Sequence, residues 1–259
     1  MRLKGKTAFI SGAGRNNGRA ISLKLASEGA NVVLIAKSRS AELNAVAADC
    51  EKLGVGALPL LGDVTSESEA QRLVKAGLDK FGRIDTLVCV AAIRPLRDPW
   101  EYTAQEWLDV FALNVHSTLY LSKAIVPGMM ERKSGTIIAL GGSNMVTVSS
   151  GHGAAVVASK AALQGLIKSL AMALGPYNVR ANMVAPAHIE NKRENPEWYK
   201  DLDKNGRPAM EDGSGRAKMT PMRRKGQPGE VANCVAFLAS DDSSYVTGDC
   251  IHCTGGWQI

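Results

Sequence analysis

Aromatic side chains, histidines and long apolar runs are all scarce in this chain of 259 residues. Aromatics make up 5% of the sequence and histidine occurs four times. The basic residues are dispersed and no aromatics alternate with them, which argues against a nucleic-acid-binding surface. No apolar run approaches the roughly 20 residues that a membrane span needs. The first residues carry neither the apolar core nor the cleavage site of a secretory signal. We therefore expect a cytoplasmic protein without nucleic-acid or membrane partners.

Cysteines are also few, and their pattern speaks against a disulfide framework. Five cysteines are an odd number in a chain long enough to bury its own core, so reduced thiols are expected. The only cluster is Cys250-Ile251-His252-Cys253. This segment is predicted to be a strand, in which Cys250 and Cys253 point to opposite faces, and no second ligand pair is visible. No metal site is predicted.

The net charge of the chain favours one class of ligand only slightly over others. Lysine and arginine number 31 against 25 acidic residues, a net charge of +6. This excess suits a negatively charged small substrate, such as a coenzyme A ester or a dicarboxylate. A solvated surface of no special function would suit it equally well.

Strand patterns alternate with helix patterns along most of the chain. Short apolar runs predict strands, and amphipathic runs between them predict helices of 10 residues or more. This order predicts an α/β fold, a single Rossmann-type domain over residues 1–259 with a doubly wound parallel sheet and helices on both faces. The expected strands are 7–10, 31–35, 57–61, 85–90, 135–140 and 180–185, and the expected helices 20–28, 40–53, 66–81, 104–130 and 154–174. Residues 187–218 break the rhythm and predict a lid over the substrate, with an unstructured surface loop as the alternative.

A glycine-rich turn follows the first predicted strand. Gly12, Asn16 and Gly18 lie between that strand and the first helix, where glycines let the backbone approach a pyrophosphate at a helix N-terminus. Asn16 stands where a glycine would be expected. Asparagine tolerates the left-handed backbone conformation better than most residues, so we expect the turn to survive.

With this turn the chain resembles the short-chain dehydrogenase/reductase family, whose signature is Thr-Gly-x-x-x-Gly-x-Gly. Asp63-Val64 matches the family's adenine-contacting pair, and Asn114 matches its active-site asparagine. The C-terminal half is similar as well, in the segments 221–232, 237–240, 245–248 and 255–256. The resemblance implies the fold above, an NAD(P) cofactor and a hydroxy or keto substrate.

The family's proton-transfer pair is incomplete. The resemblance implies a Tyr-x-x-x-Lys pair on the helix at 154–174, in which the tyrosine exchanges a proton with the substrate and the lysine assists it. Lys160 matches the lysine, but Val156 stands at the tyrosine position and cannot transfer a proton. Ser143 matches the catalytic serine by spacing, although the strand register would place Gly142 there. We expect Asn114, Ser143 and Lys160 to be catalytic remnants.

The cofactor site departs from the family pattern too. Residues 89–92 replace a polar Asn-Asn-Ala-Gly segment, and no carboxylate ends the second strand to bind the ribose of NAD. Lys37 lies there instead and could meet a 2′-phosphate, which favours NADP over NAD; a plain surface lysine is the equal alternative. NAD(P) binding is expected to be weakened or lost, leaving Gly12, Gly18 and Asp63 vestigial.

Three functions are compatible with this pattern. The first, which we favour, is a non-catalytic subunit supporting an active homologue in a hetero-oligomer, with a tetramer favoured and a small-molecule substrate near the interface. More loosely, the chain is similar to the silent subunits of heteromeric dehydrogenases that act on aromatic succinyl-CoA esters. The second is an active oxidoreductase with His152 as a substitute proton donor. The third is a non-redox nucleotide-binding or regulatory protein.

Overall fold

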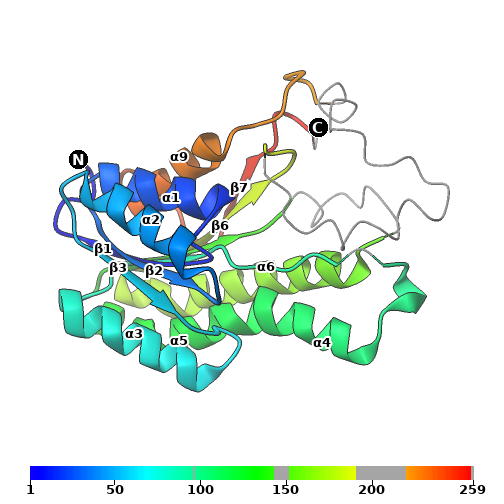
Figure 1. Ribbon diagram of the computed structural model, residues 1–259, viewed down its shortest axis with the longest axis horizontal. Coiled ribbons are helices and arrows are strands. Elements are labelled where there is room, and N and C mark those ends of the chain that lie inside the picture. The colour runs from blue at the N-terminus through cyan, green and yellow to red at the C-terminus, as the bar shows by residue number, and fades with distance from the viewer. Residues whose placement is uncertain (96, 143–151, 191–219, 258–259) are drawn as a thin grey trace.

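The computed structural model describes residues 1–95, 97–142, 152–190 and 220–257. Within them one seven-stranded sheet has the order β3-β2-β1-β4-β5-β6-β7, and every neighbouring pair is parallel. The prediction of a Rossmann-type doubly wound sheet is confirmed (Figure 1). The strands are β1 (Thr7–Ser11), β2 (Asn31–Ala36), β3 (Ala57–Leu61), β4 (Thr86–Cys89), β5 (Gly135–Leu140), β6 (Val179–Pro186) and β7 (Cys250–Cys253).

Helices connect the strands and cover both faces of the sheet (Figure 1). The α-helices are α1 (Asn16–Ser27), α2 (Ser40–Glu51), α3 (Glu67–Phe81), α4 (Ala104–Phe111), α5 (Ser117–Glu131), α6 (Ala154–Leu174) and α9 (Pro228–Ala239). Short 3-10 turns add η1 (Pro99–Glu101), η4 (Gly175–Tyr177) and η5 (Asp241–Ser243). The single helix expected over 104–130 is instead interrupted by the π-helical turn η2 (Ala112–His116), a feature that apolar periodicity does not reveal.

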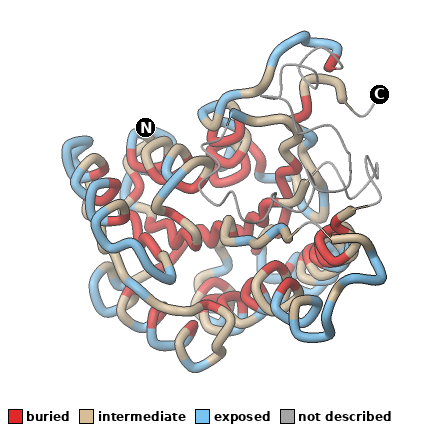
Figure 2. The backbone as a smooth tube through the Cα atoms, turned by 45° about the vertical axis from the view of Figure 1, so that its right-hand side comes forward, coloured by how far each residue is buried: buried red, intermediate tan, exposed pale blue. Residues whose placement is uncertain are grey.

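Alternate residues of each strand supply two separate cores. On one face Ile10 and Leu34 pack with α1, α2 and α9, and on the other Phe9 and Val33 pack with α3, α5 and α6. This alternation is the period-two geometry of a strand, and burial of both faces explains the nearly continuous apolar strands. Figure 2 shows the resulting buried layer through the middle of the molecule.

Helix α6 is the longest element of the core. Continued through η4, the segment Ala154–Tyr177 is the one helix in the described parts of the chain that is long and apolar enough to cross a membrane, by length and composition alone. Its residues Leu163 and Ile167 pack on the sheet with α5. Apolar composition in α6 therefore follows from its place against the core of this fold.

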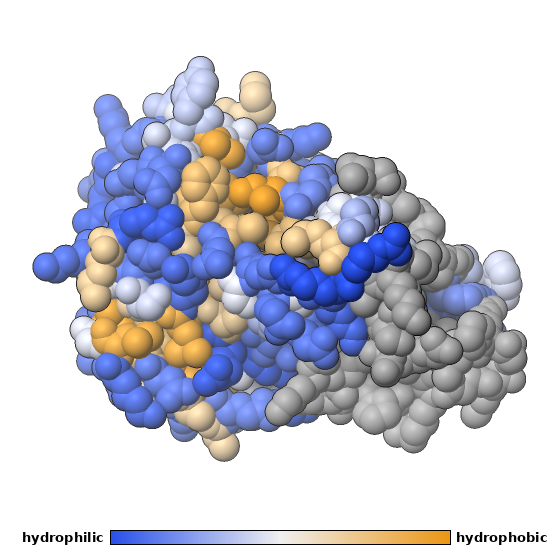
Figure 3. Space-filling model, turned by 90° about the horizontal axis from the view of Figure 1, so that it is seen from above, coloured by the Kyte–Doolittle hydropathy of each residue, from blue (hydrophilic) through white to orange (hydrophobic). Residues whose placement is uncertain are grey.

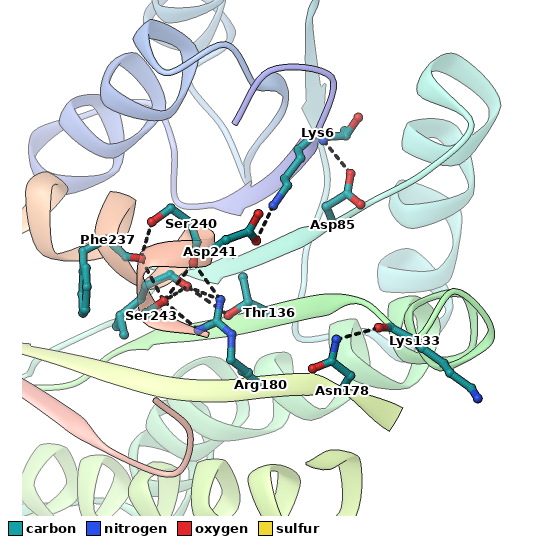
Figure 4. A network of polar contacts seen from close by, with 12 residues as sticks. Lys6, Asp85, Lys133, Thr136, Asn178, Arg180, Phe237, Ser240, Asp241 and Ser243 are labelled. Atoms are coloured by element: carbon teal, nitrogen blue, oxygen red, sulfur yellow. Dashed lines mark hydrogen bonds and ion pairs between the residues drawn. The ribbon is translucent and has the colours of Figure 1, made fainter. Parts of the chain in front are cut away.

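Arg180 ties the C-terminal end of α9 to strand β6 (Figure 4). Its guanidinium donates hydrogen bonds to the carbonyl oxygens of Leu238 at 2.9 Å and Ser240 at 3.2 Å, and to the hydroxyl of Ser243 at 2.9 Å. The last carbonyls of a helix have no partners within it, so a buried cation at this end satisfies them. Burial lowers the pKa of Arg180 from its usual value.

The segment that interrupts the alternation of helices and strands lies largely outside the described residues. Of the segment 187–218, in which a lid is predicted, the structure describes residues 187–190. There Gly226 donates its amide proton to the carbonyl of His188 at 2.8 Å, and Glu190 donates to that of Gly226 at 2.8 Å. These bonds join the chain leaving β6 to the segment that leads into α9.

Candidate functional site

The glycine-rich turn packs against itself and against the end of β4. A Cβ atom on Gly18 would lie 1.9 Å from the carbonyl oxygen of Gly12, and one on Gly12 would lie 2.8 Å from the amide nitrogen of Ala91. Asn16 has a φ of 47°, the left-handed conformation expected for it. The turn therefore needs its glycines for its own packing, whether or not a dinucleotide binds.

The first residue of this turn links β1 to the chain beyond β4. The hydroxyl of Ser11 accepts hydrogen bonds from the amides of Val90 at 3.2 Å and Ala91 at 3.4 Å. Parallel strands end at one edge of a sheet, so the turn and residues 89–92 meet there, as the cofactor-site prediction assumes.

Lys37 and Asp63 form an ion pair beyond β2 and β3. The Lys37 Nζ lies 2.7 Å from a carboxylate oxygen of Asp63, with side chains 76% and 33% exposed. Burial alone would raise the pKa of Asp63, but hydrogen bonds from Lys37 and Thr65 outweigh it and lower that pKa. Lys37 is thus paired with a carboxylate rather than solitary. Val64 beside it is buried.

Two further cations at this edge were missed by the sequence interpretation. Arg15 precedes α1 and Arg39 precedes α2, and both are exposed. A Cβ atom on Gly14 would lie 3.9 Å from the amide of Leu43, so the turn contacts the first turn of α2. Each arginine stands just before a helix that follows a strand, and the two strands, β1 and β2, are neighbours in the sheet. These positions in the sequence could have identified both cations.

Val156 occupies the first turn of α6 and is 6% exposed. One turn later the Lys160 Nζ, also buried, donates a hydrogen bond to the carbonyl oxygen of Leu140 at 2.7 Å. Burial, and secondarily the nearby Arg94, lowers the pKa of Lys160 to about 8. The site therefore holds a partly titrating amine beside an aliphatic side chain, with no phenol at position 156.

Asn114 lies in the π-helical turn and joins three elements of the site. Its side-chain amide accepts from the amide of Ile93 at 3.0 Å, and donates to the carbonyl of Ile93 at 3.1 Å and the hydroxyl of Ser159 at 3.0 Å. The structure thus joins Asn114 to the chain after β4 and, through Ser159, to α6. Ser143 lies outside the described residues.

His152 stands just before α6 and contacts a carboxylate. Its Nδ1 forms an ion pair with Asp98, and the two side chains are 19% and 12% exposed. The neighbouring amide of Gly153 donates to the carbonyl of Arg97 at 3.1 Å. The loop after β4 is therefore attached to the start of α6. Sequence interpretation did not anticipate Asp98, which is distant from His152 along the chain.

The cysteines of β7 face opposite sides, as predicted. Cys250 packs with the core that contains α6, and Cys253 packs with the core that contains α9. Cys253 contacts Cys234 of α9, whose pKa is lowered by the hydrogen bond between the thiols. The part of the chain that the structure describes contains no group of three ligands that could hold a metal ion.

Comparisons with known proteins agree with this geometry over the whole chain. Residues 12–258 match the family described as Enoyl-(Acyl carrier protein) reductase. The chain is 34% identical to the 3-oxoacyl-(acyl-carrier-protein) reductase FabG of Escherichia coli K12 and 35% identical to that of Vibrio cholerae, in both cases over the full length of both chains. A short-chain dehydrogenase/reductase from Serratia marcescens superposes with a TM-score of 0.90 at 29% identity, covering 100% of both chains.

The chain belongs to the short-chain dehydrogenase/reductase family. A solved NAD⁺-bound xylitol dehydrogenase is similarly close, with a TM-score of 0.90, 29% identity and coverage of 99% of this chain and 100% of its own. Family members in general bind NAD(P).

Proposed function

We propose that this chain is a non-catalytic subunit of a heteromeric NAD(P)-dependent dehydrogenase, supporting an active member of the same family. The observation that carries the proposal is Val156, a buried aliphatic side chain in the first turn of α6. Proton exchange with a substrate oxygen needs a group with an ionisable proton within hydrogen-bonding reach. Around this position, Asn114 is bonded to Ser159 and the Lys160 ammonium to the carbonyl oxygen of Leu140, so both side chains are held within the fold.

In this proposal the active partner subunit, and not this chain, converts the substrate. The active subunit oxidises a hydroxyl or reduces a keto group, on an acyl thioester such as a coenzyme A ester of an aromatic succinyl acid. The relatives in Escherichia coli and Vibrio cholerae are named as reductases of 3-oxoacyl thioesters, which supports that chemical class. A cytoplasmic location fits such a reaction.

The cofactor, by the same proposal, binds this chain weakly or not at all. Where it does bind, NADP is favoured, because the cations Lys37 and Arg39 follow β2, Arg15 follows β1, and no carboxylate ends β2. The ion pair of Lys37 with Asp63 is exposed, and exposed pairs contribute only about 0–1 kcal/mol. A 2′-phosphate could therefore displace Asp63 from the lysine.

Exposed apolar side chains support an assembly. Met172 on α6 is 83% exposed, and Tyr245 is fully exposed. A Cβ atom on Gly248 would lie 3.5 Å from the Cβ of Ala171, so the loop that carries Tyr245 reaches the C-terminal half of α6. Large side chains gathered in this way mark a contact surface, and we assign it to the active homologue in a tetramer.

The proposal is tested by identifying the companion subunit and by measuring the activity of each protein alone and of the complex. The tagged chain is purified from its native host, and the stoichiometric companion is identified by mass spectrometry and produced separately. We expect the isolated chain to be folded but without turnover of 3-oxoacyl or hydroxyacyl thioesters with NADH or NADPH. The reconstituted complex should turn over, and replacing the companion's catalytic tyrosine by phenylalanine should abolish that activity. Turnover by the isolated chain would overturn the proposal.

A second function is favoured by one contact, the ion pair of Asp98 with His152. A carboxylate at Nδ1 fixes the orientation of the imidazole and leaves Nε2 as the nitrogen that could exchange a proton. In this alternative the chain is an oxidoreductase in its own right. His152→Gln and Asp98→Asn should then lower kcat by at least about 100-fold, while Glu131→Gln, at the exposed end of α5, should leave it unchanged. Equal activity of all variants would exclude the alternative.

A further inference from the structure

Two of the five cysteines lie together between β7 and α9. Cys253 is the last residue of β7, and its side chain faces the core that contains α9. Cys234 is in the second turn of α9 and packs against the same core. The two thiols are close enough to form a hydrogen bond with each other. The fold thus brings together two sulfur atoms that are distant along the chain.

The residue pattern of each element explains this contact. On β7, Cys253 and Cys250 lie on opposite faces, because successive residues of a strand alternate. On α9, Cys234 follows the buried Val231 by three residues and precedes the buried Leu238 by four, which is the spacing of one helix face. Because α9 and β7 are in contact, Cys234 lies beside Cys253, and Cys250 is on the far side of the sheet.

The pair is open to reagents and is not part of a larger cluster of ligands. Cys234 and Cys253 are each half-buried, whereas Cys50 and Cys89 are buried. In the part of the chain that the structure describes, no group of three histidine, cysteine or acidic side chains could hold a metal ion. The two thiols therefore have the arrangement of a dithiol rather than that of a metal site.

Their hydrogen bond makes the two thiols unequal. The bond from the Cys253 thiol stabilises the thiolate of Cys234, so it lowers the pKa of Cys234 and raises that of Cys253. Arg224 and Glu230 lie nearby, but they are bonded to each other at 2.8 and 2.6 Å. Since the thiolate is the reactive form of cysteine, Cys234 is the nucleophile of the pair.

We propose that Cys234 and Cys253 are a site of reversible oxidation, at which a peroxide converts the two thiols into a disulfide between α9 and β7. The Cys234 thiolate attacks one oxygen of hydrogen peroxide and becomes a sulfenic acid, and the other oxygen takes up a proton and leaves as water. The Cys253 sulfur then attacks the sulfenic sulfur, the S–S bond forms, and a second water leaves. The two thiols lose two electrons and two protons in all, and a thiol reductant reverses the reaction by exchange.

The disulfide would attach the edge of the sheet to a helix. Among the described residues, β7 stands at the end of the strand order with β6 as its neighbour. The carbonyl of Cys253 accepts a hydrogen bond from the amide of Ala187 at 3.2 Å, so the chain leaving β6 meets the same point. A covalent link here fixes β7 against α9. The proposal does not rest on the subunit role, because no step uses the residues around Val156.

Peptide mapping of the oxidised chain tests the site. The reduced chain is treated with a small molar excess of hydrogen peroxide, its free thiols are alkylated under denaturing conditions, and it is digested without reductant. We expect mass spectrometry to find the peptides of Cys234 and Cys253 joined and lighter by two hydrogen atoms, with Cys250 alkylated. Dithiothreitol should restore both thiols. Alkylation of all five cysteines after this treatment, or a link found only between two chains, would overturn the proposal.

Serine substitutions separate the roles within the pair. In Cys253→Ser the sulfenic acid of Cys234 has no thiol to meet, so it should accumulate and be trapped by dimedone. Cys234→Ser should slow the consumption of peroxide at least about tenfold, because the more reactive thiolate is gone. Cys250→Ser, which removes a half-buried thiol from the other face of β7, is the matched control and should form the bond as the unchanged chain does. Loss of the bond in Cys250→Ser, or its persistence in Cys253→Ser, would contradict the assignment.

Thermal unfolding reports whether the bond fixes β7 to α9. We expect the Tm of the oxidised chain to exceed that of the reduced chain by at least about 4 °C, since the cross-link restricts the unfolded state. Cys250→Ser should show the same rise and Cys253→Ser none. A change of equal size in all variants would show that peroxide acts at other residues, and the proposal would fail.

Discussion

Position 160 holds a charged side chain in a buried setting. Its ammonium is enclosed by protein, and its bonded partner is a carbonyl oxygen at the end of β5. Burying a charge without a counter-charge is costly, and the cost appears as a lowered pKa. With a valine at position 156 the lysine has no tyrosine to assist. The free energy that the buried ammonium costs the folded state can therefore be measured.

The stability of the chain should depend on pH through Lys160. In the unfolded chain the lysine titrates near 10.5, and in the folded chain near 8. Between these values the unfolded state holds one more proton, so the free energy of unfolding rises with pH. We expect the difference between the unchanged chain and Lys160→Met, measured by urea unfolding, to shift by about 2–3 kcal/mol in favour of the lysine from pH 8 to 10.5. A difference that stays constant over this range would show that the lysine is not desolvated as described.

At the level of elements, the turn between β1 and α1 is built from contacts with itself. Gly18 faces the carbonyl of Gly12 so closely that no side chain fits, and Gly12 faces the backbone at Ala91. Gly14, in the same turn, has only Leu43 near it, at ordinary contact distance. Glycines that resemble a cofactor signature are thus needed by the fold, and their presence alone says little about nucleotide binding.

Two alanine substitutions separate these roles. Gly18→Ala should prevent folding or lower the free energy of unfolding by more than about 3 kcal/mol, because its Cβ would overlap backbone that cannot move away. Gly14→Ala is the matched control and should change that free energy by less than about 1 kcal/mol. Both are measured by chemical unfolding in the absence of nucleotide. Similar stability of the two variants would contradict the crowding of this turn.

At the scale of the whole molecule, the sheet is buried on both faces and the surface carries the remaining apolar groups. Seen over α1, α2 and α9, the surface is mainly hydrophilic, with small apolar groups between charged ones (Figure 3). Among the large apolar residues in the described parts of the chain, Tyr245 and Met172 are the most exposed. Isolated exposed side chains need no explanation, but two on neighbouring segments favour a contact surface.

Assembly should therefore depend on this surface. In the complex with the active homologue, Met172→Glu should reduce the fraction of assembled protein at least about tenfold, because a charge would be buried against apolar groups. Leu53→Glu, at another exposed apolar position, is the control and should leave the complex intact. Analytical ultracentrifugation reports both. Unchanged assembly of Met172→Glu would show that the partner contacts another face.

Much of the fold could be predicted because its signals are local. Period-two and period-3.6 patterns are properties of neighbouring residues, and the predicted ranges 57–61, 135–140 and 154–174 coincide with β3, β5 and α6. The left-handed conformation of Asn16 was predictable for the same reason. The π-helical turn around Asn114 was not, because a single extra residue per turn leaves the apolar pattern nearly unchanged.

The amino-acid sequence was enough to predict the sheet, its helical layers and the absence of a phenol at position 156. The tertiary structure was needed to show which charges meet: Lys37 with Asp63, and His152 with Asp98. Each of these pairs joins segments from different strand ends, distant along the chain. Such contacts depend on the order in which the parallel strands lie side by side. No local pattern of residues encodes which strand ends become neighbours.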